Sequence, residues 1–248
     1  MTFVSAAACS STSSNDSPKL QEDYDDTAQA ISSAIAADGN GGDVAAMSDS
    51  ASIALGVLPL GFALDGSGEV HGNRFGVAYS YSLSCEDAQG NGLPACGPLT
   101  DRADVDVSWS GDLELPNLSA AVSRDGSWTI DGLQSDTAVF DGQSSFSFDS
   151  SLRSIFRPGA EASLSIDADA SYEAVAVSTD THDAIGGQAV LDVDVHKVVT
   201  GTDHDVDKSF SVHAELLFSA DRKATLVLDD EQAYSIDFAT GAVVHLTR

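Results

Sequence analysis

Four side chains in the C-terminal half of the chain carry the groups that bind transition metals: His196, His213, Asp194 and Glu215. They occupy the polar positions of two consecutive stretches in which polar and apolar residues alternate. Imidazole and carboxylate groups are ligands of Zn²⁺ and Cu²⁺. The sequence therefore contains a candidate divalent-metal site, and the alternative is a solvent-exposed sheet face with ordinary polar residues.

The pairing register of the two stretches decides whether these groups meet. Both apolar sets must face inward, which restricts the register to shifts of two residues. The register that pairs Val195 with Ala214 places His196 opposite His213, with their β-carbons about 5 Å apart. The same register places Asp194 opposite Glu215, whereas a shift of two residues makes the histidine pair diagonal.

Two loop segments, residues 65–69 and 203–207, are rich in carboxylates. Calcium needs roughly six to eight oxygen ligands at converging positions, and neither segment has the spacing of an EF-hand. Ordinary hairpin turns are the favoured interpretation of both.

Recognisable catalytic motifs are missing from the sequence. It contains no G-x-S-x-G elbow, no H-E-x-x-H pair and no phosphate-binding glycine loop. Carboxylate pairs are too frequent here to indicate a glycosidase. We therefore expect a protein that is not an enzyme, without a cofactor unless a divalent metal binds.

Cys85 and Cys96 flank a turn-rich loop that contains glycines and a proline. A strand before the loop and a proline-bounded exit after it would bring the two thiols together. A disulfide is the favoured prediction, worth about 3 kcal/mol, and it implies an oxidising compartment. The alternatives are two free thiols or half of a metal site.

The net charge of −28 comes from 39 acidic and 11 basic residues. Nucleic acid as a partner is excluded, because phosphate binding needs clustered Lys and Arg. Three explanations of the acidity stay open: a solubilising surface, adaptation to a saline habitat, and binding of divalent cations.

From residue 57 onward, the dominant pattern is the alternation of apolar and polar residues. Residues 164–172 and 191–195 are clear examples, and Arg124-Asp125-Gly126 resembles a hairpin turn between two such stretches. This pattern gives each strand one buried face and one solvent-exposed face. Together with short turns between strands, it predicts an antiparallel meander. We expect an all-β fold of about ten to twelve strands, forming a sandwich or a barrel.

The region before residue 57 has a different pattern. Residues 10–26 are polar and are predicted to be a linker. Helical spacing of apolar residues predicts one helix beginning near Asp26 or Thr27 and a second from Asp43 to Leu55, with Asp43 as its cap. We expect a single domain over residues 27–248, with its helices within about 27–56.

The segment Ala6-Ala7-Ala8-Cys9, followed by five Ser and Thr residues, resembles the lipobox of bacterial lipoproteins. The position three before the cysteine is Ala6, where the family usually has Leu, and residues 1–9 resemble a truncated signal segment. The resemblance implies that the Cys9 thiol carries a diacylglycerol and that the new N-terminus is acylated, with palmitate or a similar chain. It implies a lipid-anchored protein of the cell envelope, periplasmic or surface-exposed, or secreted if it is not lipidated.

Three functions are compatible with the sequence. The first is a non-enzymatic envelope lipoprotein with a structural, adhesive or binding role, whose partner is an envelope or surface protein or a glycan. The second is a β-sandwich or β-barrel module that binds a small apolar ligand or a divalent metal. The third is a hydrolase with an unrecognised site.

Overall fold

A computed structural model describes residues 19–35, 42–74, 76–115, 118–153, 161–181, 183–201, 205–240 and 242–246. Two helices come first in the chain, α1 (Gln21–Ile35) and α2 (Asp43–Ala54). The strands follow: β1 (Phe62–Leu64), β2 (Val70–Arg74), β3 (Val77–Glu86), β4 (Arg102–Leu115), β5 (Leu118–Asp131), β6 (Thr137–Arg153), β7 (Glu161–Ser178), β8 (Ala184–Thr200), β9 (Val206–Ser219), β10 (Lys223–Leu228), β11 (Gln232–Asp237) and β12 (Ala242–His245).

All twelve strands lie in one antiparallel sheet, in chain order from β1 to β12. Alternation favours this arrangement, since long strands such as β7 and β9 bury every second residue over most of their length and expose the others. In the described part of the chain, β1 and β12 do not pair with each other, so the meander stays open. The predicted all-β meander with two N-terminal helices is confirmed.

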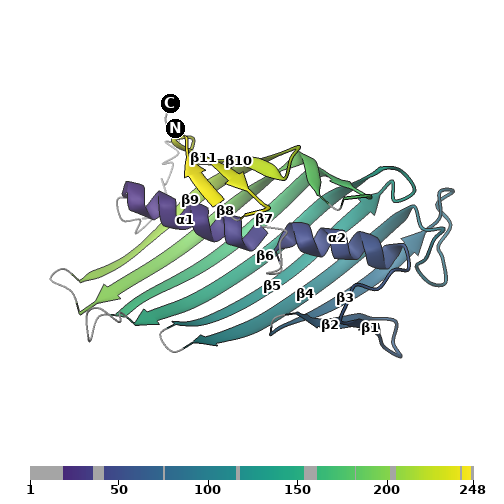
Figure 1. Cartoon of the computed structure of the whole chain (residues 1–248), viewed down its shortest axis with the longest axis horizontal. Helices are drawn as coiled ribbons and strands as arrows, with labels where there is room; N and C mark the ends of the chain where they lie inside the picture. Colours follow the sequence, from purple (N-terminus) through teal and green to yellow (C-terminus); the bar gives the residue numbers. More distant parts are fainter. Residues whose placement is uncertain are drawn as a thin grey trace, which may run out of the picture.

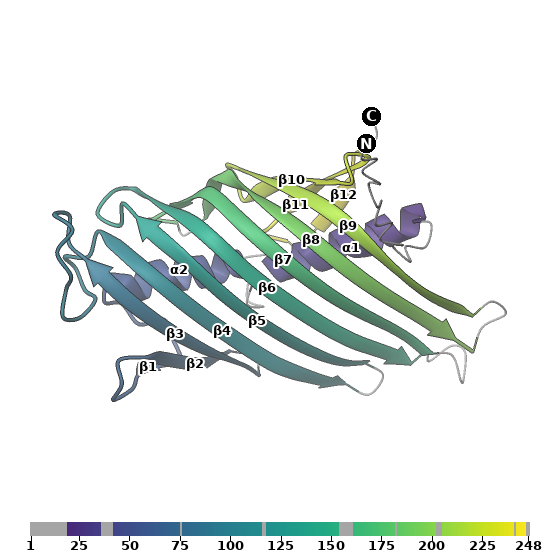
Figure 2. The same cartoon turned by 180° about the vertical axis from the view of Figure 1, so that it is seen from behind.

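Both helices cover the same face of the sheet, which we call the inner face (Figure 1). Strands β10–β12 lie on the same side of the long strands as α1, which makes the fold sandwich-like. The outer face, seen in Figure 2, has no helix over it. Neither helix of the described residues is long and apolar enough to cross a membrane.

Helix α1 begins earlier than predicted, so residues 21–26 are helical and are not part of a linker. The Leu20 amide donates to the Asp23 carboxylate at 2.8 Å, and acidic groups favour the positive end of a helix. Tyr24, Ala28, Ile31 and Ile35 are buried at helical spacing. The early start also has a tertiary cause, because acidic residues of this first turn pair with lysines of the sheet.

Those lysines are Lys197 on β8 and Lys208 on β9, directly opposite each other on the inner face. Lys208 forms an ion pair with Asp23, whose side chain is fully buried. Lys197 pairs with Asp26 at 2.6 Å. Long-range pairing of this kind fixes α1 on the sheet and leaves no signal in the local sequence.

Helix α2 has the predicted bounds to within a residue, but Asp43 is not its cap. Gly42 occupies the N-cap position without a side-chain hydrogen bond. The Asp43 carboxylate is buried instead, and its Oδ2 lies 2.5 Å from the Arg124 guanidinium. The Ser144 hydroxyl (3.1 Å) and the Tyr172 hydroxyl donate to the same oxygen. Residue Asp43 therefore ties α2 to strands β5, β6 and β7.

The predicted turn at Arg124-Asp125-Gly126 is wrong, because β5 runs through it without a break. Arg124 is buried beside Asp43 and also donates to the Ala34 carbonyl at 2.7 Å, at the end of α1. Gly126 leaves space for the indole of Trp128, since a β-carbon there would lie 2.4 Å from that ring. Arg124 and Gly126, which suggested a turn, therefore serve contacts with the helices and with Trp128.

Candidate functional site

The outer faces of strands β3–β9 carry mainly serine and aspartate, and we call this surface the serine–aspartate face. Residues that alternate along each strand are brought into rows across the sheet by the pairing register. The central row is Ser80, Ser108, Asp125, Ser145, Asp169, Asp192 and His213. A row on one side is Ser110, Ser123, Ser147, Asp167, Asp194 and Ser211, and on the other Ser82, Asp106, Ser127, Gln143, Ser171, Val190 and Glu215.

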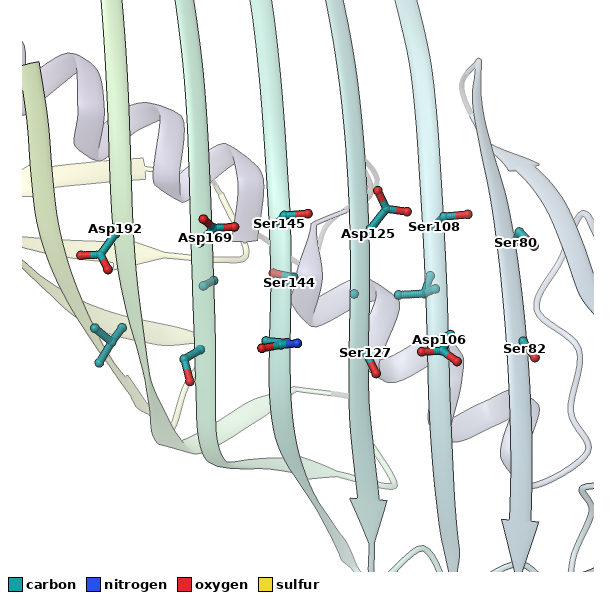
Figure 3. A pocket seen from close by; sticks show the side chains of 16 residues that line it. Ser80, Ser82, Asp106, Ser108, Asp125, Ser127, Ser144, Ser145, Asp169 and Asp192 are labelled. Atoms are coloured by element: carbon teal, nitrogen blue, oxygen red, sulfur yellow. The ribbon is translucent and has the colours of Figure 1, made fainter. Parts of the chain in front are cut away.

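Short side chains make this surface shallow and hollowed. Serine reaches less far from the sheet than aspartate, so the serine positions lie low between the carboxylates. A hollow of about 670 Å³ spans β3 to β8, and Figure 3 shows the central row crossing it from Ser80 to Asp192. Smaller hollows of 390, 260 and 240 Å³ adjoin the same rows. The shape suits an extended ligand that lies on the surface.

Four carboxylates form a block at the centre of this surface. Asp169 lies directly opposite Asp192, and Asp167 directly opposite Asp194, on β7 and β8. Together with Asp125 they line the 260 Å³ hollow. Like charges directly opposite each other destabilise a sheet. A bound cation would therefore relieve a repulsion that the fold builds into this position.

The third strand of this region, β9, holds two of the carboxylates in place. The Ser211 hydroxyl donates to Asp194 at 2.5 Å. A ring nitrogen of His213 lies 2.9 Å from Asp192, and this hydrogen bond raises the pKa of the imidazole. None of the residues in the three rows is Lys or Arg. Within the rows, only the His213 imidazole can carry a positive charge beside the block.

The register expected for the candidate metal site is wrong. Val195 pairs with Phe210 and not with Ala214, although both apolar sets do face inward as expected. His213 lies opposite Asp192, and His196 lies opposite Ser209. The two histidines are therefore four residues apart in register, about 13 Å along the strands.

The remaining members of that predicted site are also separated. Glu215 faces Val190, and Asp194 faces Ser211. His196 instead lies 3.0 Å from Asp207 on the neighbouring strand. The register depends on how the chain closes the turn between β8 and β9, which alternation alone does not define. The four residues share one face but do not converge.

One group of described residues does bring metal-binding atoms together, namely Asp65, Glu69 and His71 on the exposed β1–β2 hairpin. Asp65 Oδ1 accepts bonds from the Ser67 hydroxyl and amide, at 2.7 and 2.8 Å, and from the Gly68 and Glu69 amides. The Ser67 bonds lower the pKa of Asp65 to about 2. These bonds make Asp65 a turn-stabilising residue, as expected for a hairpin; the other carboxylate-rich segment, 203–207, lies partly outside the described residues.

The two cysteines predicted to pair form a disulfide, with their α-carbons 5.3 Å apart. It joins the end of β3 to the loop that precedes β4. Cys9 lies outside the described residues, so its lipidation stays a prediction.

Searches against protein-family models, curated proteins and solved structures find no match to this chain. The candidate site therefore depends on the geometry alone. The alternation of Asp and Ser along each strand is visible in the sequence. Their alignment across strands into rows is not, because it depends on six pairing registers at once.

Proposed function

We propose that this chain is a non-enzymatic binding protein of the cell envelope that attaches to a basic polypeptide segment through its serine–aspartate face. The observation that carries the proposal is the alignment of carboxylates into rows around the block Asp167, Asp169, Asp192 and Asp194. Rows of carboxylates attract cations over several ångströms and guide their approach.

An extended polycation fits this surface better than a single ion. A metal needs several ligand atoms that converge on one point. The rows instead space their side chains about 4.8 Å apart across strands and about 6.6 Å apart along them. A lysine- or arginine-rich segment lying across β5–β8 would place positive charges over Asp125, Asp169 and Asp192 of the central row.

An apolar ligand has less support. The apolar side chains of the inner face are covered by α1 and α2. The hollow between α2 and strands β6–β7 measures about 10 Å³, which is barely the space of one water. The hollows of the serine–aspartate face are lined mainly by polar and acidic side chains.

The proposed location depends on two features. A disulfide between Cys85 and Cys96 is typical of proteins that fold outside the reducing cytoplasm. The lipobox-like segment adds a lipid anchor at Cys9. The intact mass of the chain isolated from membranes tests the anchor, since lipid on Cys9 adds the mass of its acyl chains and Cys9→Ser abolishes that gain.

Binding of an oligolysine peptide, followed by calorimetry, tests the proposed ligand. We expect measurable affinity that decreases as salt increases, and none for oligoglutamate. The pair of substitutions Asp167→Asn and Asp169→Asn should weaken binding about tenfold, since each exposed charge pair contributes about 0.2–1 kcal/mol. The matched control, Asp136→Asn with Asp180→Asn, makes the same change in net charge on loops away from the rows.

Two results would contradict the proposal. Equal weakening by both pairs of substitutions would mean that only total charge matters. Tight binding of Ca²⁺ with a fixed stoichiometry, lost in Asp167→Asn, would make the block a metal site.

A further inference from the structure

Residues 51–64 and residues 88–100 contain no charged residue, although the chain has a net charge of −28. They meet in space, because a β-carbon on Gly56 would lie 3.1 Å from the α-carbon of Gly97. The first includes the loop after α2, and the second belongs to the β3–β4 loop. Figures 1 and 2 show both loops at one end of the long axis, away from the start of α1.

Aliphatic side chains project from this end into solvent. Leu60 is 95% exposed, Leu99 74%, Val57 62% and Leu58 45%. We call these four residues the apolar tip. Exposed apolar residues on two loops that contact each other indicate a surface that contacts something apolar.

The backbone of the tip is held in place from below. The Val57 amide donates to the Ser52 carbonyl at 2.9 Å, and the Phe62 amide to the Pro59 carbonyl at 3.1 Å. The disulfide from Cys85 to Cys96 holds the second loop. The side chains are therefore presented by a fixed scaffold, and Leu60 projects the furthest.

The size of the tip distinguishes between possible partners. Four aliphatic side chains supply roughly 250–500 Å² of apolar surface. A stable protein–protein contact buries about 800 Å² on each partner. The tip is too small for that, whereas a few projecting apolar side chains are sufficient to enter the interface of a lipid bilayer.

We propose that the apolar tip inserts into the interfacial region of a lipid bilayer whose surface is uncharged or zwitterionic. The charge distribution supports this partner, since anionic lipid repels the acidic body, whereas residues 51–64 and 88–100 carry no charge that opposes close approach to an uncharged surface. This contact does not depend on the serine–aspartate face or on the proposed lipid anchor. It would give the protein a membrane contact at the end opposite the start of α1.

Flotation with vesicles tests this proposal, using the full chain with Cys9→Ser so that no acyl chain contributes. Vesicles of phosphatidylcholine should carry the protein upward. Vesicles containing half phosphatidylglycerol should bind it more weakly at low salt, with recovery at high salt. Substitution Leu60→Asp should reduce the partition coefficient at least about tenfold.

The matched control is Leu217→Asp, at an exposed leucine of β9 on the outer face. It should leave partitioning unchanged. Thermal melting of both variants checks that each still folds. The proposal would be overturned if the parent chain failed to float, or if both variants lost vesicle binding equally. A dimer in sedimentation that Leu60→Asp dissociates would also overturn it, since that outcome assigns the tip to a second copy.

Discussion

The two faces of the sheet treat charge in opposite ways. On the inner face, the basic residues Lys197, Lys208 and Arg124 each contact an aspartate of a helix, and the Asp23 and Asp43 side chains are completely buried. On the outer face, aspartates oppose aspartates and the rows contain no Lys or Arg. Charge on the inner face serves to attach the helices, whereas charge on the outer face remains available to a partner.

The largest expected effect concerns the inner face. Substitution Arg124→Met leaves the buried Asp43 carboxylate without its counter-charge and should lower the free energy of unfolding by about 3–5 kcal/mol at neutral pH. Denaturant unfolding measures this value. Arg102→Met is the control, because Arg102 forms an exposed pair with Asp131 and should cost less than about 1 kcal/mol. Similar losses of unfolding free energy in both variants would show that the buried pair of the inner face contributes no more than the exposed pair does.

A second effect should appear in the dependence of stability on pH. Burial raises the pKa of Asp43 to about 6 from its ordinary 3.8, despite the attraction of Arg124. The folded chain therefore holds this proton more tightly than the unfolded chain does. Its contribution to stability decreases as the pH rises from about 4 to about 6, by roughly 3 kcal/mol.

Melting curves of the parent chain and of Asp43→Asn across this pH range, at constant ionic strength, test that contribution. The asparagine variant has no proton to lose at this position. Its melting temperature should lack the part of the decline that belongs to Asp43. Parallel profiles for the two proteins would show that the buried group does not titrate there.

The smallest effect concerns the outer face and has the opposite sign to the loss expected on the inner face. Asp169→Asn removes one of two facing carboxylates and should stabilise the fold by about 0.2–1 kcal/mol at low salt. The gain should vanish at high salt, where screening already weakens the repulsion. By contrast, Asp23→Asn should destabilise, because Lys208 would lose its partner. Chemical denaturation at two salt concentrations separates these cases.

The sequence predicted the strands and helices because their periods are local properties. Alternation along residues 164–172 identifies one strand and its buried face without any knowledge of its neighbours. The errors arose at positions where residues distant in the sequence determine the local conformation. Arg124 and Gly126 have the composition of a turn, but a helix and an indole ring determine their positions.

The same limit applies to the candidate site. The sequence correctly indicated which positions of β8 and β9 face outward, since alternation determines whether the odd-numbered or the even-numbered residues of a strand are exposed. It did not predict that His213 pairs with Asp192, because the register of that hairpin depends on the turn geometry. The rows of the serine–aspartate face depend on this choice at every pair of strands, so they could be described only from the structure.

The open meander ends in two very short strands, three residues in β1 and four in β12. A broad sheet with long free borders would recruit strands from other molecules and grow into fibres. These two borders offer few backbone groups for that growth, but residues 206–213 of β9 also have no partner among the described strands on the side away from β8, because β10 pairs only with residues 214–219. Along that longer border, the high net negative charge keeps neighbouring molecules apart. The molecule can therefore expose a wide sheet to its surroundings without polymerising.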